Sequence, residues 1–123
     1  MFDYLEQHIE DILAGEASAC EYIAQKNCEI KYNVVMQDER ESGLREVLNL
    51  GHTVGRAIET VSGYELLHGE AVSIGLAAQA RLGCQLGYIS RENVARVEKL
   101  LARAKLPVNV PKYIDKHELL LKL

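Results

Sequence analysis

Residues 68–86 read HGEAVSIGLAAQARLGCQL, and this stretch decides the fold. Wound as a helix, it carries small or apolar side chains on nearly every side. A helix of that kind is buried inside its protein, whereas a surface helix is apolar along one side only. We therefore expect a buried helix over residues 68–86 rather than an amphipathic one.

The residues before this stretch also carry apolar side chains at helical spacing. Residues 2–13 form one apolar stripe, and residues 16–38 form a second. A strand at residues 32–36 is the alternative, because that part is β-branched, but its flanks carry no hairpin signal. The glycines expected to mark helix breaks are Gly15, Gly43, Gly63 and Gly87.

The residues after the buried stretch predict two more helices. Ser90 has the position of an N-cap for a helix whose apolar face runs to Lys105. Asp115 and Glu118 have capping-box spacing in front of a short last helix. The chain as a whole is therefore interpreted as an all-α, multi-helical bundle, in a single helical domain that spans residues 1–123.

The composition is that of an ordinary globular protein. Of its 123 residues, 48% are hydrophobic and 26% are charged, which argues against intrinsic disorder. The net charge of −4 is spread evenly along the chain, which argues against nucleic acid or an anionic membrane as a partner. No apolar run approaches the ~18 residues of a membrane span, and no leader opens the chain, so we expect a cytoplasmic protein.

The prolines and cysteines indicate where long helices can form and which kinds of cysteine site to exclude. The two prolines, Pro107 and Pro111, both lie near the end of the chain. A proline inside a helix destabilises that helix by ~3 kcal/mol, so the proline-free residues before position 107 can form long helices. Cys20, Cys28 and Cys84 form no C-x-x-C pair. A disulfide framework or a thiolate zinc site is therefore not expected, and we predict reduced, mostly buried thiols.

Residues 42–62 are predicted as one helix with an apolar and a polar side. Its core face contains Leu44, Val47, Leu48, Val54, Ile58 and Val61. The polar side contains four residues in a row: Arg45, Asn49, His52 and Arg56. Their spacing of i, i+4, i+7 and i+11 places them within a narrow arc of one helix. Such a row fits a surface that holds an anion and a metal ion, but an ordinary solvated helix face fits it equally well.

Two glycines and a second histidine favour the metal. Gly51 and Gly55 lie four residues apart, where small residues allow another backbone or a ligand to approach closely. His68 opens the next helix, so His52 and His68 can meet across an antiparallel helix pair and share one divalent cation. Two ligands hold a metal ion poorly, however, and a lone buried histidine is more often a core residue. From spacing alone, both interpretations stay open.

Other catalytic patterns are missing from the sequence. His68 and Glu70 form half of the zinc-deaminase signature, but no P-C-x-x-C follows. The sequence contains no H-E-x-x-H, no G-x-S-x-G, no G-x-G-x-x-G and no P-loop. His8 and His117 are expected at the surface.

Two stretches carry a family resemblance. Residues 45–59 read REVLNLGHTVGRAIE and residues 67–75 read LHGEAVSIG, and together they closely resemble the C-terminal helical domain of 3-dehydroquinate synthase. The upstream residues 31–35, KYNVV, followed by Asp38 and Glu39, are similar to the same family. The combined G-H-T-x-G and L-H-G-E-A pattern is highly specific. Related sugar-phosphate cyclases of the 2-deoxy-scyllo-inosose synthase type carry similar motifs and are the alternative.

The resemblance implies an enzyme of the shikimate pathway, a phosphate-eliminating lyase. Family members convert 3-deoxy-D-arabino-heptulosonate 7-phosphate to 3-dehydroquinate and phosphate, using NAD and a zinc or cobalt ion. By motif match, His52 and His68 are two of three metal ligands. Lys31, Arg45 and Asn49 hold the carboxylate, hydroxyl or phosphate groups of the sugar-phosphate substrate. A homodimer is left open.

The sequence departs from the family at Arg56, where the family usually has a second histidine. Arginine keeps its charge and binds phosphate, but it cannot exchange a proton near neutral pH, so we expect anion binding there. The third metal ligand, a glutamate, and the NAD-binding α/β domain are expected upstream of residue 1. The chain alone is therefore expected to be inactive. A non-catalytic helical scaffold is the alternative from a different class, and Arg56 is its only support.

Overall fold

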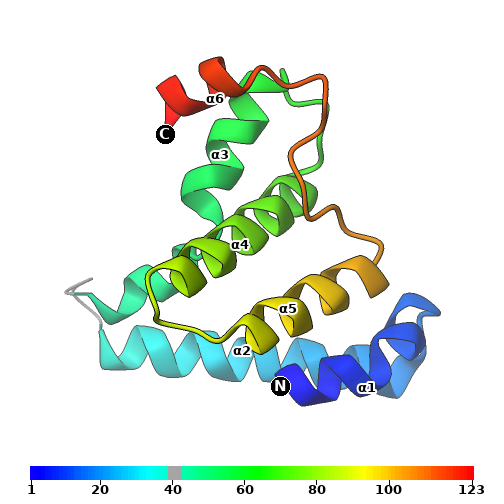
Figure 1. Cartoon of the computed structure of the whole chain (residues 1–123). Helices are drawn as coiled ribbons and strands as arrows, with labels where there is room; N and C mark the ends of the chain where they lie inside the picture. Colours follow the sequence, from blue (N-terminus) through cyan, green and yellow to red (C-terminus); the bar gives the residue numbers. More distant parts are fainter. Residues whose placement is uncertain (39–42) are drawn as a thin grey trace. The chain divides into compact units, whose positions relative to one another are not determined.

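The computed structural model describes residues 1–38 and 43–123, so Glu39 of the family resemblance lies outside the described residues. Within these residues every element is helical, which confirms the all-α prediction. The elements are α1 Phe2–Leu13, α2 Ala17–Gln37, the 3-10 helix η1 Leu44–Asn49, α3 His52–Val61, α4 His68–Gln85, α5 Arg91–Arg103 and α6 Lys116–Lys122 (Figure 1). The alternative of a strand at residues 32–36 is wrong, because these residues lie inside α2.

The described chain divides into two compact units, residues 1–49 and residues 50–123. The first unit contains α1, α2 and η1, and the second contains α3 to α6. Each unit is described below by itself. The single domain over residues 1–123 stays a prediction.

In the first unit, α1 and α2 form a helical hairpin. Gly15 has a φ of +74°, a left-handed conformation that ends α1 where the sequence predicts it. Glu16 then caps α2, since its carboxylate accepts hydrogen bonds from the backbone N–H groups of Ser18 and Ala19 and from the Ser18 hydroxyl. These hydrogen bonds, the hydroxyl first, hold the pKa of Glu16 below its ordinary value. The rings of Tyr4 and Tyr22 pack across the two helices, with centroids 4.0 Å apart.

The turn from α2 into η1 depends on a buried carboxylate. Asp38 is only 4% exposed, and its Oδ2 accepts hydrogen bonds from the backbone N–H groups of Gly43 and Arg45, both at 2.9 Å. A carboxylate that accepts backbone N–H groups replaces the hydrogen bonds that a helix start lacks. Asp38 thereby fixes where η1 begins relative to α2.

The prediction of one helix over residues 42–62 is wrong. Gly51 has a φ of +81°, so the right-handed helix stops there and α3 begins at His52. Part of the predicted core face is wrong for the same reason, because Leu44 is 43% exposed and Val47 is 53% exposed. Ile58 on α3 is fully buried, as expected.

The second unit is built on the close packing of α3 against α4. A Cβ atom placed on Gly75 would collide with the carbonyl oxygen of Gly51, and one placed on Gly55 would lie 3.2 Å from the Ala71 carbonyl oxygen. The expected role of the glycines on α3 is therefore confirmed. The core that surrounds this contact contains Ala57, Ile58, Ala71, Ile74, Ile114 and Leu119, with Val54, Val61, Leu66 and Val110 packed against it.

Helix α4 is buried along its first half only. The side chains of Ile74 and Ala77 are buried, but Leu82 and Leu86 are exposed, so the prediction of a fully buried helix fails at its C-terminal end. The predicted N-cap of α5 is confirmed, because the Ser90 hydroxyl oxygen accepts the Asn93 N–H at 3.1 Å.

The last segments are fixed by polar contacts. The buried Ser73 hydroxyl donates to the Pro107 carbonyl oxygen at 2.7 Å, which holds the proline-containing connection against α4. The Asp115 carboxylate accepts the N–H groups of His117 and Glu118, which confirms the predicted start of α6.

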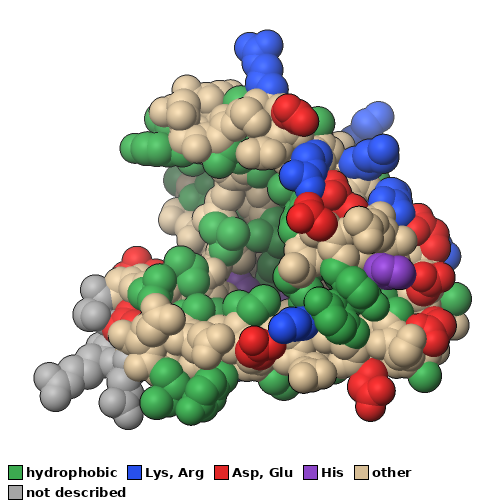
Figure 2. Space-filling view, turned by 90° about the horizontal axis from the view of Figure 1, so that it is seen from below, with side chains coloured by type: hydrophobic (Ala, Val, Ile, Leu, Met, Phe, Trp, Pro, Cys, Tyr) green, Lys and Arg blue, Asp and Glu red, His purple; other side chains and the backbone are tan. Residues whose placement is uncertain are grey.

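The surface carries apolar side chains in several separate groups, as the face drawn in Figure 2 illustrates.

Among the cysteines, Cys28 is exposed while Cys20 and Cys84 are partly buried, so the prediction of mostly buried thiols is wrong, although all three are free. The His117 side chain is exposed as predicted, and His8 packs on the Tyr4 ring at 4.4 Å between centroids. In the described residues, no helix combines the length and the hydropathy that a membrane span requires.

Candidate functional site

The structure brings His52 and His68 together. His52 is the first residue of α3 and His68 is the first residue of α4. The two helices touch at the glycines described above, and this packing places the imidazole ring centroids 5.3 Å apart at an angle of 57°. The meeting of the two histidines, expected from their places on consecutive helices, is therefore present, while the role of metal ligand stays a prediction.

Both rings use Nδ1 for a hydrogen bond within the protein. His52 Nδ1 lies 3.2 Å from the Leu50 carbonyl oxygen, and His68 Nδ1 lies 3.0 Å from Oε1 of Glu59. A carbonyl oxygen and a carboxylate are acceptors only, so in each neutral ring Nδ1 carries the proton. The lone pair is then on Nε2 of each ring, which is the arrangement that histidine ligands have in metal proteins.

The ligand set formed by the described residues is incomplete. No group of three or more His, Cys, Asp or Glu side chains arranged to hold a metal ion occurs in residues 1–38 and 43–123. Glu70 follows His68 closely in sequence, but its Oε2 accepts the Leu67 N–H at 2.9 Å and so caps α4. Two imidazole nitrogens suit zinc or cobalt chemically, and a third protein ligand is usual for a catalytic zinc. The pair fits part of a metal site.

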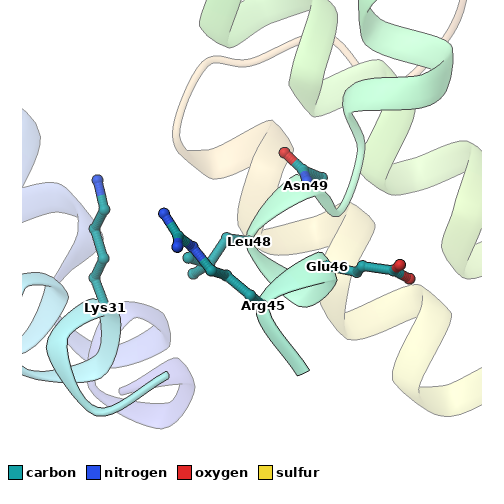
Figure 3. A pocket seen from close by; sticks show the side chains of 5 residues that line it. All are labelled: Lys31, Arg45, Glu46, Leu48 and Asn49. Atoms are coloured by element: carbon teal, nitrogen blue, oxygen red, sulfur yellow. The ribbon is translucent and has the colours of Figure 1, made fainter. Parts of the chain in front are cut away.

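A separate pocket lies in the first unit, with a volume of about 330 Å³. Its lining residues are Lys31 from α2 and Arg45, Glu46, Leu48 and Asn49 from η1. The side chains of Lys31 and Arg45 extend toward the same space, whereas the Glu46 carboxylate points away from both (Figure 3). Two cations and one amide can bind a phosphate or carboxylate together with a neighbouring hydroxyl group.

The four polar residues predicted in one row do not share a helix. Arg45 and Asn49 belong to η1 in the first unit, and His52 and Arg56 belong to α3 in the second. Since Gly51 separates the two helices, the predicted arc of one helix is wrong. The structure instead brings Arg45 and Asn49 together with Lys31. Arg56 lies one turn after His52 on α3, with an exposed side chain.

Sequence reasoning missed three residues that organise these sites. Glu59 holds His68, and its position seven residues after His52 on α3, hence on the same helix face, was a usable signal. Asp38 holds the start of η1, and an aspartate directly after a helix is a common backbone cap. Gln79 accepts the Gly51 N–H through its side-chain oxygen, a contact from α4 that no local pattern announces.

Comparison with known proteins gives consistent matches. Residues 1–123 match the family described as 3-dehydroquinate synthase C-terminal. The chain is 47% identical to the 3-dehydroquinate synthase of Caldanaerobacter subterraneus over 110 residues, which cover 89% of this chain and 31% of that protein. It is 49% identical to the 3-dehydroquinate synthase of Nitrosococcus oceani over 116 residues, covering 94% and 32%. It is 50% identical to the chloroplastic 3-dehydroquinate synthase of Arabidopsis thaliana over 111 residues, covering 89% and 25%. The chain thus spans about a third or less of the length of these relatives.

Proposed function

Because the chain belongs to the 3-dehydroquinate synthase C-terminal family, we propose that it supplies the metal-binding and substrate-binding residues of such an enzyme. The reaction is the conversion of 3-deoxy-D-arabino-heptulosonate 7-phosphate to 3-dehydroquinate and phosphate in the shikimate pathway. The observation that carries the proposal is the pair of facing imidazoles, His52 and His68, whose Nδ1 atoms are both engaged and whose Nε2 atoms are left for one cation.

In this proposal His52 and His68 each contribute Nε2 to a zinc or cobalt ion, which when bound supplies a Lewis acid and a template for the substrate. Lys31, Arg45 and Asn49 bind the anionic and hydroxyl groups of the sugar phosphate. The convergence of both cations on one pocket supports this assignment.

Arg56 has a different role from the other site residues. Its guanidinium adds a permanent positive charge one helical turn from His52, which attracts a phosphate. It cannot exchange a proton near neutral pH, so no proton transfer is assigned to this position.

The proposal concerns only the part of the reaction that these 123 residues serve. These two relatives are about three times as long as the matched stretch, and the 123 residues contain no G-x-G-x-x-G pattern. NAD is therefore proposed as a cofactor of the reaction without binding residues in this chain. The cytoplasmic location and the homodimer stay proposals, and one relative is named as chloroplastic.

The test is a chimera in which this chain replaces the matching stretch of the Caldanaerobacter subterraneus enzyme. Phosphate release is measured with NAD, zinc and heptulosonate phosphate. We expect turnover, and its loss in His52→Ala and His68→Ala but not in the control His117→Ala, whose side chain is exposed on α6.

Two results would refute the proposal. A chimera that folds, as judged by circular dichroism, but releases no phosphate indicates the non-catalytic scaffold. Phosphate release from glucose 6-phosphate, and not from the heptulosonate phosphate, indicates a cyclase of the 2-deoxy-scyllo-inosose synthase type.

A further inference from the structure

We infer that Glu59 is a positioning residue of the metal site, whose carboxylate holds the Nδ1–H of His68 and thereby presents the Nε2 lone pair to the cation. This inference rests on the proposed function, because it concerns a metal ion that His68 is proposed to bind. Its core claim, that Glu59 sets the tautomer and orientation of the ring, can be measured without any metal.

The geometry gives Glu59 this role. Its side chain is only 15% exposed, whereas the His68 side chain is 60% exposed, and the two meet at 3.0 Å between Oε1 and Nδ1. The shielded carboxylate thus holds one edge of a ring that is otherwise open to solvent. A histidine side chain with that much exposure would rotate about its χ angles if nothing held it. Glu59 is the one described side chain that holds it by a hydrogen bond.

The two histidines differ in how they are held. His52 Nδ1 pairs with a backbone carbonyl, that of Leu50, which no substitution removes. His68 Nδ1 pairs with a side chain from the neighbouring helix, that of Glu59, so a substitution of Glu59 can change the orientation of the His68 ring. A carboxylate partner also makes the opposite ring nitrogen a better electron-pair donor than a neutral carbonyl does. His68 is therefore the stronger ligand of the pair, because the Glu59 carboxylate accepts its Nδ1–H.

Direct ligation by Glu59 is the competing interpretation. The carboxylate lies at Nδ1, while the free lone pair is on Nε2, so carboxylate and lone pair are at different edges of the ring. Glu59 also forms no group of three metal ligands with the two histidines in the described residues. A positioning role through His68 fits both observations.

The experiment uses the 123-residue chain and three substitutions: Glu59→Ala, Glu59→Gln and the control Glu65→Ala, an exposed glutamate of the same unit. Nitrogen-15 NMR of the histidine rings, at a pH of about 8.5 where an ordinary imidazole is neutral, reports which ring nitrogen carries the proton. We expect His68 to be protonated at Nδ1 in the wild type, in Glu59→Gln and in the control, since a glutamine oxygen accepts the same hydrogen bond. In Glu59→Ala we expect a mixture of tautomers.

Zinc titration of the same four proteins, with zinc alone as the probe, gives the second readout. We expect Glu59→Ala to weaken zinc binding by about 10-fold or more, the size typical of a lost hydrogen-bond partner of a ligand. Glu59→Gln should restore most of that loss, and the control should equal the wild type. Circular dichroism checks that all four proteins are folded.

The two claims fail in different ways. An unchanged His68 tautomer in Glu59→Ala overturns the inference, and so does a changed tautomer with unchanged zinc affinity, which would make the contact merely structural. Loss of zinc affinity in Glu59→Gln equal to that in Glu59→Ala, with the tautomer kept, indicates direct ligation and overturns it as well. A wild-type chain that binds no zinc counts against the proposed metal function, and the tautomers then decide on the role of Glu59.

Discussion

A single methyl group at Gly75 is predicted to destabilise the second unit. Gly75 lies on α4 directly against the start of α3, and a Cβ atom there would collide with the Gly51 carbonyl oxygen. The same atom would lie 2.9 Å from the Gly51 carbonyl carbon, so the obstacle is backbone and not the end of a flexible side chain. In Gly75→Ala the two helices must therefore move apart or α4 must bend.

The size of the effect follows from two opposing terms. Overpacking a well-packed contact costs about 1–3 kcal/mol, and a backbone obstacle belongs at the upper end, about 3 kcal/mol. Replacing a helical glycine by alanine recovers about 1 kcal/mol of helix propensity. We expect a net loss of about 2 kcal/mol. With an m-value of about 1 kcal/mol per molar urea for a chain of this size, the unfolding midpoint should fall by about 2 M.

Gly83→Ala is the matched control in the same helix. A Cβ atom at Gly83 would meet only the Ile89 side chain, at 3.7 Å, which is an ordinary van der Waals contact. This substitution should therefore stabilise the protein by up to about 1 kcal/mol. Both variants are unfolded in urea and followed by far-ultraviolet circular dichroism. A midpoint for Gly75→Ala at or above that of the wild type would refute the close approach of α3 and α4, and with it the placement of His52 beside His68.

Further predictions concern the pocket, the pH dependence and the departure from the family. Lys31→Ala should weaken the binding of inorganic phosphate to the chain several-fold, as measured by calorimetry at low salt. The control Lys26→Ala removes a cation that pairs with Glu29 outside the pocket, and it should leave phosphate binding unchanged. Equal losses in both variants would argue against the pocket as the anion site. The lowered pKa of Glu16, caused first by the Ser18 hydroxyl, stabilises the folded chain above the ordinary glutamate pKa, and this contribution is lost as the pH falls through the lowered value. Wild type should thus lose more stability than Glu16→Gln between about pH 5 and pH 3 in urea titrations, and parallel pH profiles would contradict the cap. In the chimera, Arg56→His should add a histidine titration to the pH profile of phosphate release, and an unchanged profile would show that residue 56 takes no part in proton exchange.

Helix ends were predictable wherever the signal is local. Gly15, Ser90 and Asp115 act on backbone groups within a few residues, so the sequence alone places the ends of α1, α5 and α6. The meeting of His52 with His68 was predictable only in part: consecutive helices joined by a short connection pack against each other, but which residues then meet depends on the glycine contacts between α3 and α4.

The break at Gly51 was beyond local reasoning. Apolar periodicity runs through residues 44–61, and a glycine inside a helix costs only about 1 kcal/mol, which does not decide between a helix and a turn. The turn is favoured by partners on α4: the Gln79 side chain accepts the Gly51 N–H, and Gly75 leaves room for the Gly51 carbonyl. Both partners lie more than twenty residues away in the sequence, so the split of the polar row between η1 and α3 follows from tertiary packing.

The glycine contacts of α4 also set the rules for engineering this protein. A side chain at position 75 would collide with the Gly51 backbone, and one at position 51 would lie 2.8 Å from the Val72 carbonyl oxygen, so neither position has room for more than glycine. A mutant library of α4 should therefore keep glycine at position 75 and vary position 83, where a side chain has room. Selection for thermostability can then act on position 83 while the close packing of α3 against α4 is kept.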